Sequence, residues 1–188
     1  MKYKVYPTLL NTFARFERGL VTDQELLDRI NRVPIPQTEA QARGVSFEDA
    51  VLKGVGEDLF DPDVIIRARH LLPSPMVATQ VYCEYPIGDV LFYGFADVLG
   101  RSMAVDLKST KSYSEQRFAE DHQNFYLPAL QSRGVTTLRY IITDFSDLFT
   151  EEYDLQTDFS VQKRQILAFV DFLEQSRHLI TDRRIFTA

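Results

Sequence analysis

Three charged residues interrupt an otherwise apolar stretch in the middle of the chain. Asp97 lies within residues 94–99, and Asp106 and Lys108 lie within residues 103–110, with a short polar turn between the two runs. This pattern predicts a β-hairpin, whose side-chain period of two places Asp106 and Lys108 on one face. With Asp97 on the same face across the hairpin, two carboxylates and an ammonium group would converge. Burying such charges is costly unless they bind a metal or each other, so the stretch is a candidate site.

The residue types and their spacing suit metal-assisted hydrolysis of a phosphodiester. Asp97 and Asp106 would hold Mg²⁺, or Mn²⁺, in a site of oxygen ligands that keeps water molecules for exchange with phosphate. Lys108 would share the face of Asp106 and so could orient the attacking water or stabilise charge on the phosphate. Leu107 points into the core in this arrangement, and its backbone carbonyl would supply a further metal ligand.

The composition is that of a globular protein with one sizeable core. The chain has 188 residues, of which 45% are hydrophobic and 12% aromatic, which suits a single domain over residues 1–188. No run of about 18 apolar residues predicts a membrane span, and no apolar stretch follows the first lysines as in a signal peptide. Cys83 is the only cysteine, which excludes an internal disulfide and a multi-cysteine zinc or iron–sulfur site. We therefore expect an intracellular, cytoplasmic protein.

The charge balance limits how the chain would meet nucleic acid. The net charge is −6, from 21 Lys and Arg against 27 Asp and Glu. This argues against a protein that coats nucleic acid by long-range attraction. It does not exclude a nuclease, because bound metal and a local basic rim can offset an acidic site. A homo-oligomer, such as a ring or dimer, would supply the basic surface that one acidic chain lacks.

The apolar periodicity and the breakers predict a mixed β-sheet flanked by helices. Three consecutive strands and a crossover helix to a fourth strand give this arrangement. Three regions are expected: an N-terminal helical cover (1–44), a core that carries the site (45–143), and an acidic loop with a C-terminal helix (144–188). The predicted helices cover residues 7–19, 23–31, 46–53 with Ser46 as N-cap, 61–72, 115–132 and 161–180. The predicted strands cover residues 77–85, 94–99, 103–110 and 136–143, with a turn at 86–89 and an irregular acidic segment at 144–159.

The chain resembles the PD-(D/E)XK nuclease superfamily, in particular its RecB-like exonuclease branch. Asp97 matches the first acidic position, and Asp106-Leu107-Lys108 matches the (D/E)-x-K motif. The run Phe47-Glu48-Asp49-Ala50-Val51-Leu52 is similar to a helix that carries a metal-binding His or Glu in that branch, which would make Glu48 a further ligand. The opening Tyr6-Pro7-Thr8-Leu9-Leu10-Asn11-Thr12-Phe13 resembles the N-terminal helix signature of the family.

The resemblance implies a restriction-endonuclease-like fold and a Mg²⁺-dependent deoxyribonuclease, with DNA as partner. His122–Leu130 resembles the Gln-x-x-x-Tyr motif that follows the active-site hairpin, but Gln123 and Tyr126 are three residues apart. Either His122 or Gln123 therefore takes the glutamine position, next to Tyr126. Lys111 is a further candidate for contact with phosphates. The iron–sulfur cysteines of Cas4-like members are missing, and any helicase or recombination partner would be a separate chain. DNA recombination, repair or phage DNA processing would be the setting.

Three other interpretations stay open from the sequence. Asp106 and Lys108 could form a weak ion pair on a surface hairpin, and Glu48 could merely complement its helix dipole. The chain could be a non-catalytic nucleic-acid or protein interaction module that keeps the nuclease fold. It could also be an interaction protein whose 144–159 segment docks a basic partner through its acidic side chains, which are Asp144, Asp147, Glu151 and Glu152.

Overall fold

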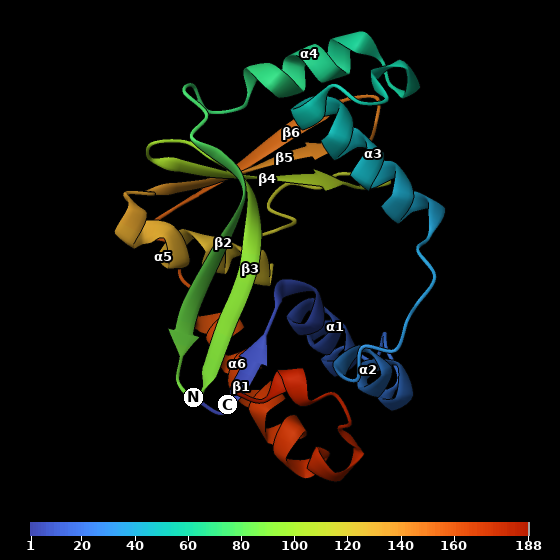
Figure 1. Cartoon of the computed structure of the whole chain (residues 1–188), viewed down its shortest axis with the longest axis vertical. Helices are drawn as coiled ribbons and strands as arrows, with labels where there is room; N and C mark the ends of the chain where they lie inside the picture. The colour runs from blue at the N-terminus through green and yellow to red at the C-terminus, as the bar shows by residue number, and fades with distance from the viewer. Residues whose placement is uncertain (188) are drawn as a thin grey trace.

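The computed structural model describes residues 1–187 and shows a six-stranded mixed β-sheet flanked by helices (Figure 1). This is the predicted fold class. The strands are β1 (Tyr3–Val5), β2 (Ala78–Ile87), β3 (Val90–Leu99), β4 (Met103–Ser109), β5 (Thr137–Thr143) and β6 (Leu148–Asp154). The α-helices are α1 (Pro7–Glu17), α2 (Asp23–Ile30), α3 (Glu39–Lys53), α4 (Pro62–His70), α5 (Tyr126–Leu130) and α6 (Ser160–Gln175).

The sheet combines antiparallel hairpins with two parallel pairings. Its order is β1-β3-β4-β5-β6, and β2 pairs with β3 as a long antiparallel hairpin. The short strand β1, which the sequence pattern did not reveal, runs parallel to the first residues of β3. β4 and β5 are parallel and are connected through α5, as predicted for a crossover helix. β6 closes the sheet as an antiparallel edge strand.

The sheet divides where β3 meets β4. These two strands pair only at Val98↔Val105 and Leu99↔Ala104, next to the turn that joins them. Beyond these pairs they diverge: β2 and β3 run toward β1, whereas β4 continues beside β5 and β6, as Figure 1 shows. We call the opening between β3 and β4 the fork. Its two sides carry the three charged residues that interrupt the apolar stretch.

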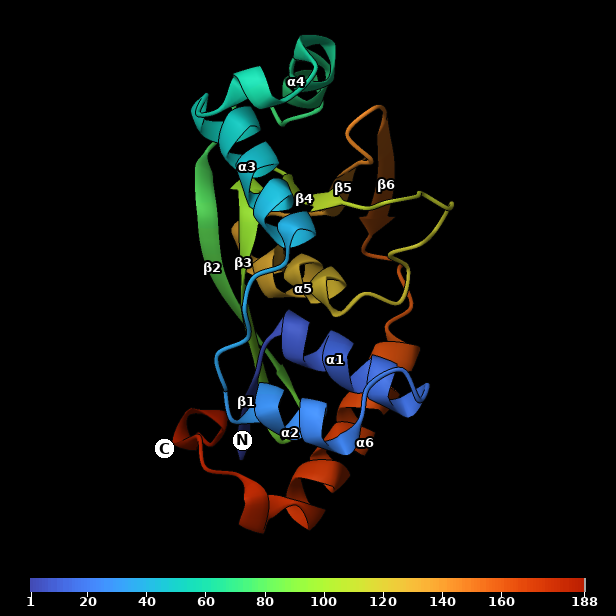
Figure 2. The ribbon, with the colours of Figure 1, turned by 90° about the vertical axis from the view of Figure 1, so that its right-hand side faces the viewer.

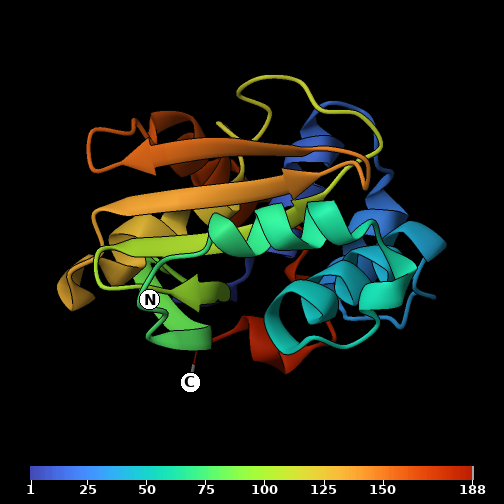
Figure 3. The ribbon, with the colours of Figure 1, turned by 90° about the horizontal axis from the view of Figure 1, so that it is seen from above.

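Two hydrophobic clusters of buried residues pack against the strands that form the fork. The larger lies between the sheet and helices α1, α5 and α6, and it includes Phe13, Phe92, Phe125, Tyr140 and Phe169, all buried. The smaller lies under α3 and α4 (Figures 2 and 3), and it includes Phe47, Val64, Val98, Val105 and Ile141. Alternate residues of β4 therefore enter different clusters, because Ala104 packs in the larger and Val105 in the smaller. This alternation turns Asp106 and Lys108 toward the side of the larger cluster.

The helix predicted over residues 46–53 begins seven residues earlier, at Glu39. Thr38 is its N-cap, and Gln41 completes a capping box with it. Ser46 is not a cap but lies inside the helix, where its hydroxyl donates to the Ala42 carbonyl at 3.1 Å. The first turns of α3 are exposed and contain no apolar periodicity, so the hydrophobic pattern could not reveal them.

The helix predicted over residues 115–132 begins only at Asp121, which caps a short 3₁₀ turn at His122–Phe125 before α5. Gln116 has a positive φ of 56°, and the backbone N–H groups of Arg117 and Phe118 donate to the Glu151 carboxylate at 2.8 and 3.1 Å. Because these two N–H groups donate to a side chain, they are not available for the backbone hydrogen bonds of a helix over residues 115–120. Other boundaries also shift: β2 extends to Ile87 through the predicted turn, and α6 ends at Gln175 rather than near 180.

The acidic segment 144–159 contains strand β6, contrary to the irregular structure predicted for it. Its acidic side chains are engaged within the chain. Asp144 accepts from the backbone N–H groups of residues 146 and 147, Glu151 is buried and accepts as described above, Glu152 pairs with Arg139, and Asp147 lies 3.6 Å from Arg67. The side chains of Asp147 and Glu152 nevertheless stay 66% and 50% exposed, at the surface of the chain.

None of the helices among residues 1–187 is long and apolar enough to cross a membrane.

Candidate active site

The fork brings the side chain of Asp97 to strand β4 without direct strand pairing. Asp97 Oδ2 accepts a hydrogen bond from the backbone N–H of Leu107 at 2.7 Å. Asp97 thus lies close to Asp106 and Lys108, although the two strands no longer pair at this level as they would in a regular hairpin. The carboxylate takes the place of the missing ladder acceptor and satisfies a buried N–H group. Asp97 is only 9% exposed.

Asp106 and Lys108 form an ion pair at the bottom of the fork. The Lys108 ammonium contacts Asp106 Oδ2 and lies 3.3 Å from the Leu107 carbonyl oxygen. Asp106 is 1% exposed, and this burial raises the pKa of its carboxyl group. Burial lowers the pKa of Lys108, but the carboxylates of Asp106, Asp97 and Asp121 together raise it above its usual value. The lysine is therefore a charged group surrounded by acids, which rules out a solvated ion pair on a surface hairpin.

Glu48 of α3 reaches the fork through Gln80 of β2. The Gln80 side-chain amide nitrogen donates to Glu48 Oε1 at 2.7 Å and to Asp97 Oδ1 at 3.2 Å. Burial raises the pKa of Glu48, and the nearby charge of Asp97 raises it further. Gln80, near the beginning of β2, has a positive φ of 50°, a conformation that is strained for a residue with a side chain. This backbone strain accompanies a contact with two acids.

The oxygen atoms in the fork have the chemistry of a divalent-cation site. Asp97, Asp106 and the Leu107 carbonyl supply only oxygen donors, the type that Mg²⁺ and Mn²⁺ prefer. Asp106 Oδ2 is buried and has the Lys108 ammonium as its contact. Among residues 1–187, no three His, Cys, Asp or Glu side chains are gathered closely enough to hold a metal. Glu48 thus lies beside the pair of aspartates, bound to Gln80, rather than completing a cluster of three acids.

His122 and Gln123, the two candidates for the glutamine position of the downstream motif, lie in different surroundings. His122 is fully buried, and its Nδ1 contacts Asn11 Oδ1 of α1 at 2.8 Å. Burial lowers the pKa of His122 to about 4, so the ring is neutral. Gln123 and Tyr126 line a cavity of about 260 Å³ at the edge of β3. Gln123, not His122, is therefore placed to meet a ligand.

Tyr126 packs directly on Gly94. A Cβ atom at Gly94 would lie 2.6 Å from Tyr126 Cε1, so this strand position has no room for a side chain. Burial raises the pKa of Tyr126, and the charges of Asp106 and Asp97 raise it further, so its hydroxyl stays protonated. Tyr126 thus connects the wall of the cavity with the acidic fork.

Lys111 lies apart from the three charged residues of the fork, on the loop that follows β4. It lines a larger cavity of about 690 Å³ together with Arg43 of α3 and Arg117. The Arg43 guanidinium stacks over the Phe145 ring at 4.1 Å, and Arg117 contacts Thr110 and the Ser112 carbonyl. The same cavity is also lined by the carboxylates of Glu39 and Asp144, so its lining holds three cations and two acids.

Gln80, Asp121 and Asn11 are the polar residues near the site that the sequence pattern did not single out. Asp121 accepts from the Gln123 backbone N–H at 2.7 Å and from the Asn11 amide at 3.3 Å, and its charge acts on Lys108. Asn11 belongs to the N-terminal stretch quoted above, which could have directed attention to it. Gln80 has no such signal, because its role depends on the register of β2 and β3 and on its unusual φ.

The fold, a mixed β-sheet flanked by helices, is shared with proteins of known structure. Superposition finds a provisionally assigned exonuclease from Eubacterium rectale with a TM-score of 0.63 and 10% identity, over 95% of this chain and 83% of that one. It also finds the protein SSO0001 with a TM-score of 0.52 and 15% identity, over 94% and 79% of the two chains. At such identities the likeness concerns the fold. Neither models of protein families nor curated protein sequences match the chain.

Replacement of Gln80 would test whether its amide organises the acids. If the fork binds Mg²⁺, Gln80→Ala should raise the Mg²⁺ concentration required for half-saturation by about 10- to 100-fold, because supporting contacts of metal ligands have effects of this size. Gln80→Gly removes the same amide, but glycine adopts a positive φ without strain. Its free energy of unfolding should therefore be about 1 kcal/mol higher than that of Gln80→Ala. Calorimetric titration with Mg²⁺ and denaturant unfolding measure the two effects. An unchanged metal requirement in both variants would contradict the role.

Proposed function

We propose that this chain is a divalent-metal-dependent DNA nuclease that hydrolyses phosphodiester bonds. The observation that carries the proposal is the fork, in which two buried aspartates and a charged lysine lie close together. The fold shared with a provisionally assigned exonuclease supports it. The match to Asp-x-Lys and to the surrounding motifs favours the RecB-like branch within the PD-(D/E)XK superfamily.

Each residue of the fork has a distinct part in the proposed reaction. Asp97, Asp106 and the Leu107 carbonyl would hold Mg²⁺ or Mn²⁺, with Glu48 assisting. When bound, the ion polarises the phosphate and lowers the pKa of water. Lys108 orients the attacking water and offsets the negative charge that gathers on the phosphate. Asp97 also fixes the backbone of the Asp106–Lys108 strand through the Leu107 N–H group, which keeps these groups in place.

Linear and circular DNA together test this function. The purified chain is incubated with end-labelled linear DNA and with circular single- and double-stranded DNA, each with Mg²⁺, with Mn²⁺ and with EDTA. Loss of DNA only with a divalent ion is the expected result, and loss of linear DNA alone would define an exonuclease. Cleavage that persists in EDTA would contradict the proposal. The setting in recombination, repair or phage DNA processing, inside the cell and alongside a separate helicase or recombination protein, belongs to the same proposal.

The ion pair in the fork favours one second candidate, a non-catalytic module that keeps the nuclease fold. The Lys108 ammonium bridges Asp106 Oδ2 and the Leu107 carbonyl, two of the oxygens that a divalent ion would use. In a module without catalysis this ammonium would permanently replace the ion. Calorimetric titration with Mg²⁺ and Mn²⁺ separates the two: heat of binding that disappears in Asp106→Asn supports the nuclease, and its absence in the unaltered chain supports the module.

A further inference from the structure

An aromatic cavity lies next to the acidic fork, at a free part of the β3 edge. β1 pairs with β3 only up to Phe92, and β4 pairs with it only from Val98, which leaves the edge of residues 93–97 without a neighbouring strand in these pairings. The cavity of about 260 Å³ opens at this place. Its aromatic walls and polar groups are Tyr6, Tyr93, Phe95, Tyr126, Arg32 and Gln123.

An exposed pair of aromatic rings continues this cavity toward the candidate catalytic residues. Phe95 is 49% exposed and Tyr82 is 40% exposed, although both are large rings within a regular hairpin. Their ring centroids lie 5.3 Å apart across the two strands. Asp97 follows Phe95 by two positions, and Gln80 precedes Tyr82 by two. The rings therefore lie about 7 Å along the strands from Gln80 and Asp97.

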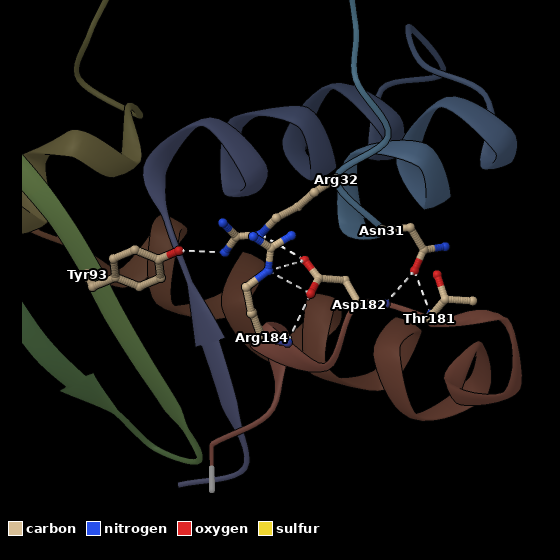
Figure 4. A network of polar contacts seen from close by, with 6 residues as sticks. All are labelled: Asn31, Arg32, Tyr93, Thr181, Asp182 and Arg184. Atoms are coloured by element: carbon tan, nitrogen blue, oxygen red, sulfur yellow. Dashed lines mark hydrogen bonds and ion pairs between the residues drawn. The ribbon is translucent and has the colours of Figure 1, made fainter.

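One cation is held firmly at the far side of the cavity. The Arg32 guanidinium donates to the Tyr93 hydroxyl at 2.7 Å and pairs with Asp182 at 2.9 Å (Figure 4). It also lies over the Tyr6 ring, 5.2 Å from its centroid. Arg184 contacts the same Asp182 carboxylate. Two guanidinium groups thus share one carboxylate, and a positive charge is left beside the cavity. The Arg32 side chain is already ordered by these contacts, so binding of an anion beside it costs little further conformational entropy.

We propose that this cavity and the Phe95–Tyr82 pair bind unpaired bases of the DNA strand whose phosphodiester lies in the fork. This inference rests on the proposed nuclease function and narrows its substrate to single-stranded DNA or a frayed end. Flat aromatic faces stack on bases of any sequence, and Arg32 supplies the charge that a neighbouring phosphate needs. Bases within a duplex keep their faces stacked on one another, so only unpaired bases can use these rings. The cavity and the Phe95–Tyr82 pair would then bind the same DNA strand on which the carboxylates of the fork act.

The binding test uses a fluorescent oligothymidine and a duplex of equal length, in EDTA so that no cleavage occurs. Fluorescence anisotropy compares the unaltered chain with Phe95→Ala, Phe95→Leu and Phe95→Tyr. We expect tighter binding of the single strand, weakened about 5- to 150-fold in Phe95→Ala and restored in Phe95→Tyr, since stacking on one ring has this value. Phe95→Leu keeps apolar area but no aromatic face and should stay weak. Leu167→Ala, which removes an exposed apolar side chain of α6 that is 58% exposed, is the matched control and should bind as the unaltered chain does.

The same variants separate failure of this inference from failure of the proposed function. Phe95-dependent binding of the single strand without cleavage in Mg²⁺ or Mn²⁺ would leave the base site standing and refute the nuclease. Metal-dependent cleavage with equal affinity for duplex and single strand, unaffected by Phe95→Ala, would overturn the base site alone. Light scattering adds a third readout: if Phe95→Ala changes the molecular mass in solution and not the DNA affinity, the rings form a contact between copies of the chain and the inference is wrong.

Discussion

Lys108→Ala and Asp106→Asn are each expected to reduce Mg²⁺-dependent cleavage of DNA by at least about 100-fold. Lys108 would lose the charge that stabilises the phosphate as the reaction proceeds, and Asp106 would lose a ligand charge, and single groups of these kinds contribute on this scale. Initial rates at saturating Mg²⁺ measure the effect. Cleavage at the rate of the unaltered chain in both variants would refute the assignment of the fork as the active site.

Both variants should remain folded, which makes their rates interpretable. Burial raises the pKa of the Asp106 carboxyl, so in Lys108→Ala this group can take up a proton and need not stay as an unpaired buried charge. Asp106→Asn keeps the size of the side chain. Lys163→Ala is the matched control: this exposed lysine lies on α6, away from the residues of the fork, and its loss should leave the rate unchanged. Thermal unfolding followed by circular dichroism verifies the folded state of all three.

Phe125→Ala is expected to lower the free energy of unfolding by about 3–5 kcal/mol, and Tm by about 6–20 °C. Phe125 is fully buried and packs against the rings of Phe92, Phe159 and Tyr85, with centroids at 5.4, 5.4 and 6.0 Å. Its truncation leaves a cavity at the centre of the larger cluster. Differential scanning calorimetry or denaturant titration measures the loss.

Phe95→Ala is the comparison within the same aromatic group. Phe95 is half-exposed and contacts Tyr82 on the surface of the hairpin, so its truncation should change the free energy of unfolding by less than about 1 kcal/mol. A large loss for Phe95→Ala, or a small one for Phe125→Ala, would show that the surface rings carry stability and the buried ring does not. That result would contradict the packing described above.

The sequence was sufficient for the parts of the fold that follow local rules. The apolar runs around Asp97 and Asp106, with the breakers at residues 100–102, predicted residues 94–99 of β3, its turn and β4, but not the first four residues of β3. The helix end predicted at residue 132 lies close to Gly134, which has a φ of +88° and caps the helical segment before β5. The choice of Asp97, Asp106 and Lys108 needed only their charge within an apolar surrounding. These predictions depend on neighbours along the chain, which a sequence displays directly.

The parts that could not be predicted depend on groups that are distant in the sequence. The fork forms because β3 pairs with β1 at one end and β4 pairs with β5 beyond the turn, and neither pairing has a local signal. Gln80 donates to Glu48, which is 32 residues away in the sequence. The Glu151 carboxylate accepts from the backbone N–H groups of Arg117 and Phe118, which are 34 and 33 residues away, and so competes with helix formation there. Helical propensity alone cannot anticipate such competition.

The hydrogen bond from Leu107 to Asp97 constrains how such a chain can change over evolutionary time. In the proposed reaction Asp97 is a metal ligand, and it also completes the backbone bonding of β4, so its loss would leave a buried N–H group without an acceptor. Asp106 and Lys108 have no such second duty to a main-chain group of β3. A descendant that gave up catalysis would therefore keep Asp97 for its stability and lose Lys108 or Asp106 first. In a lineage of such chains, a retained first aspartate alone would be a sign of inherited architecture and not of retained activity.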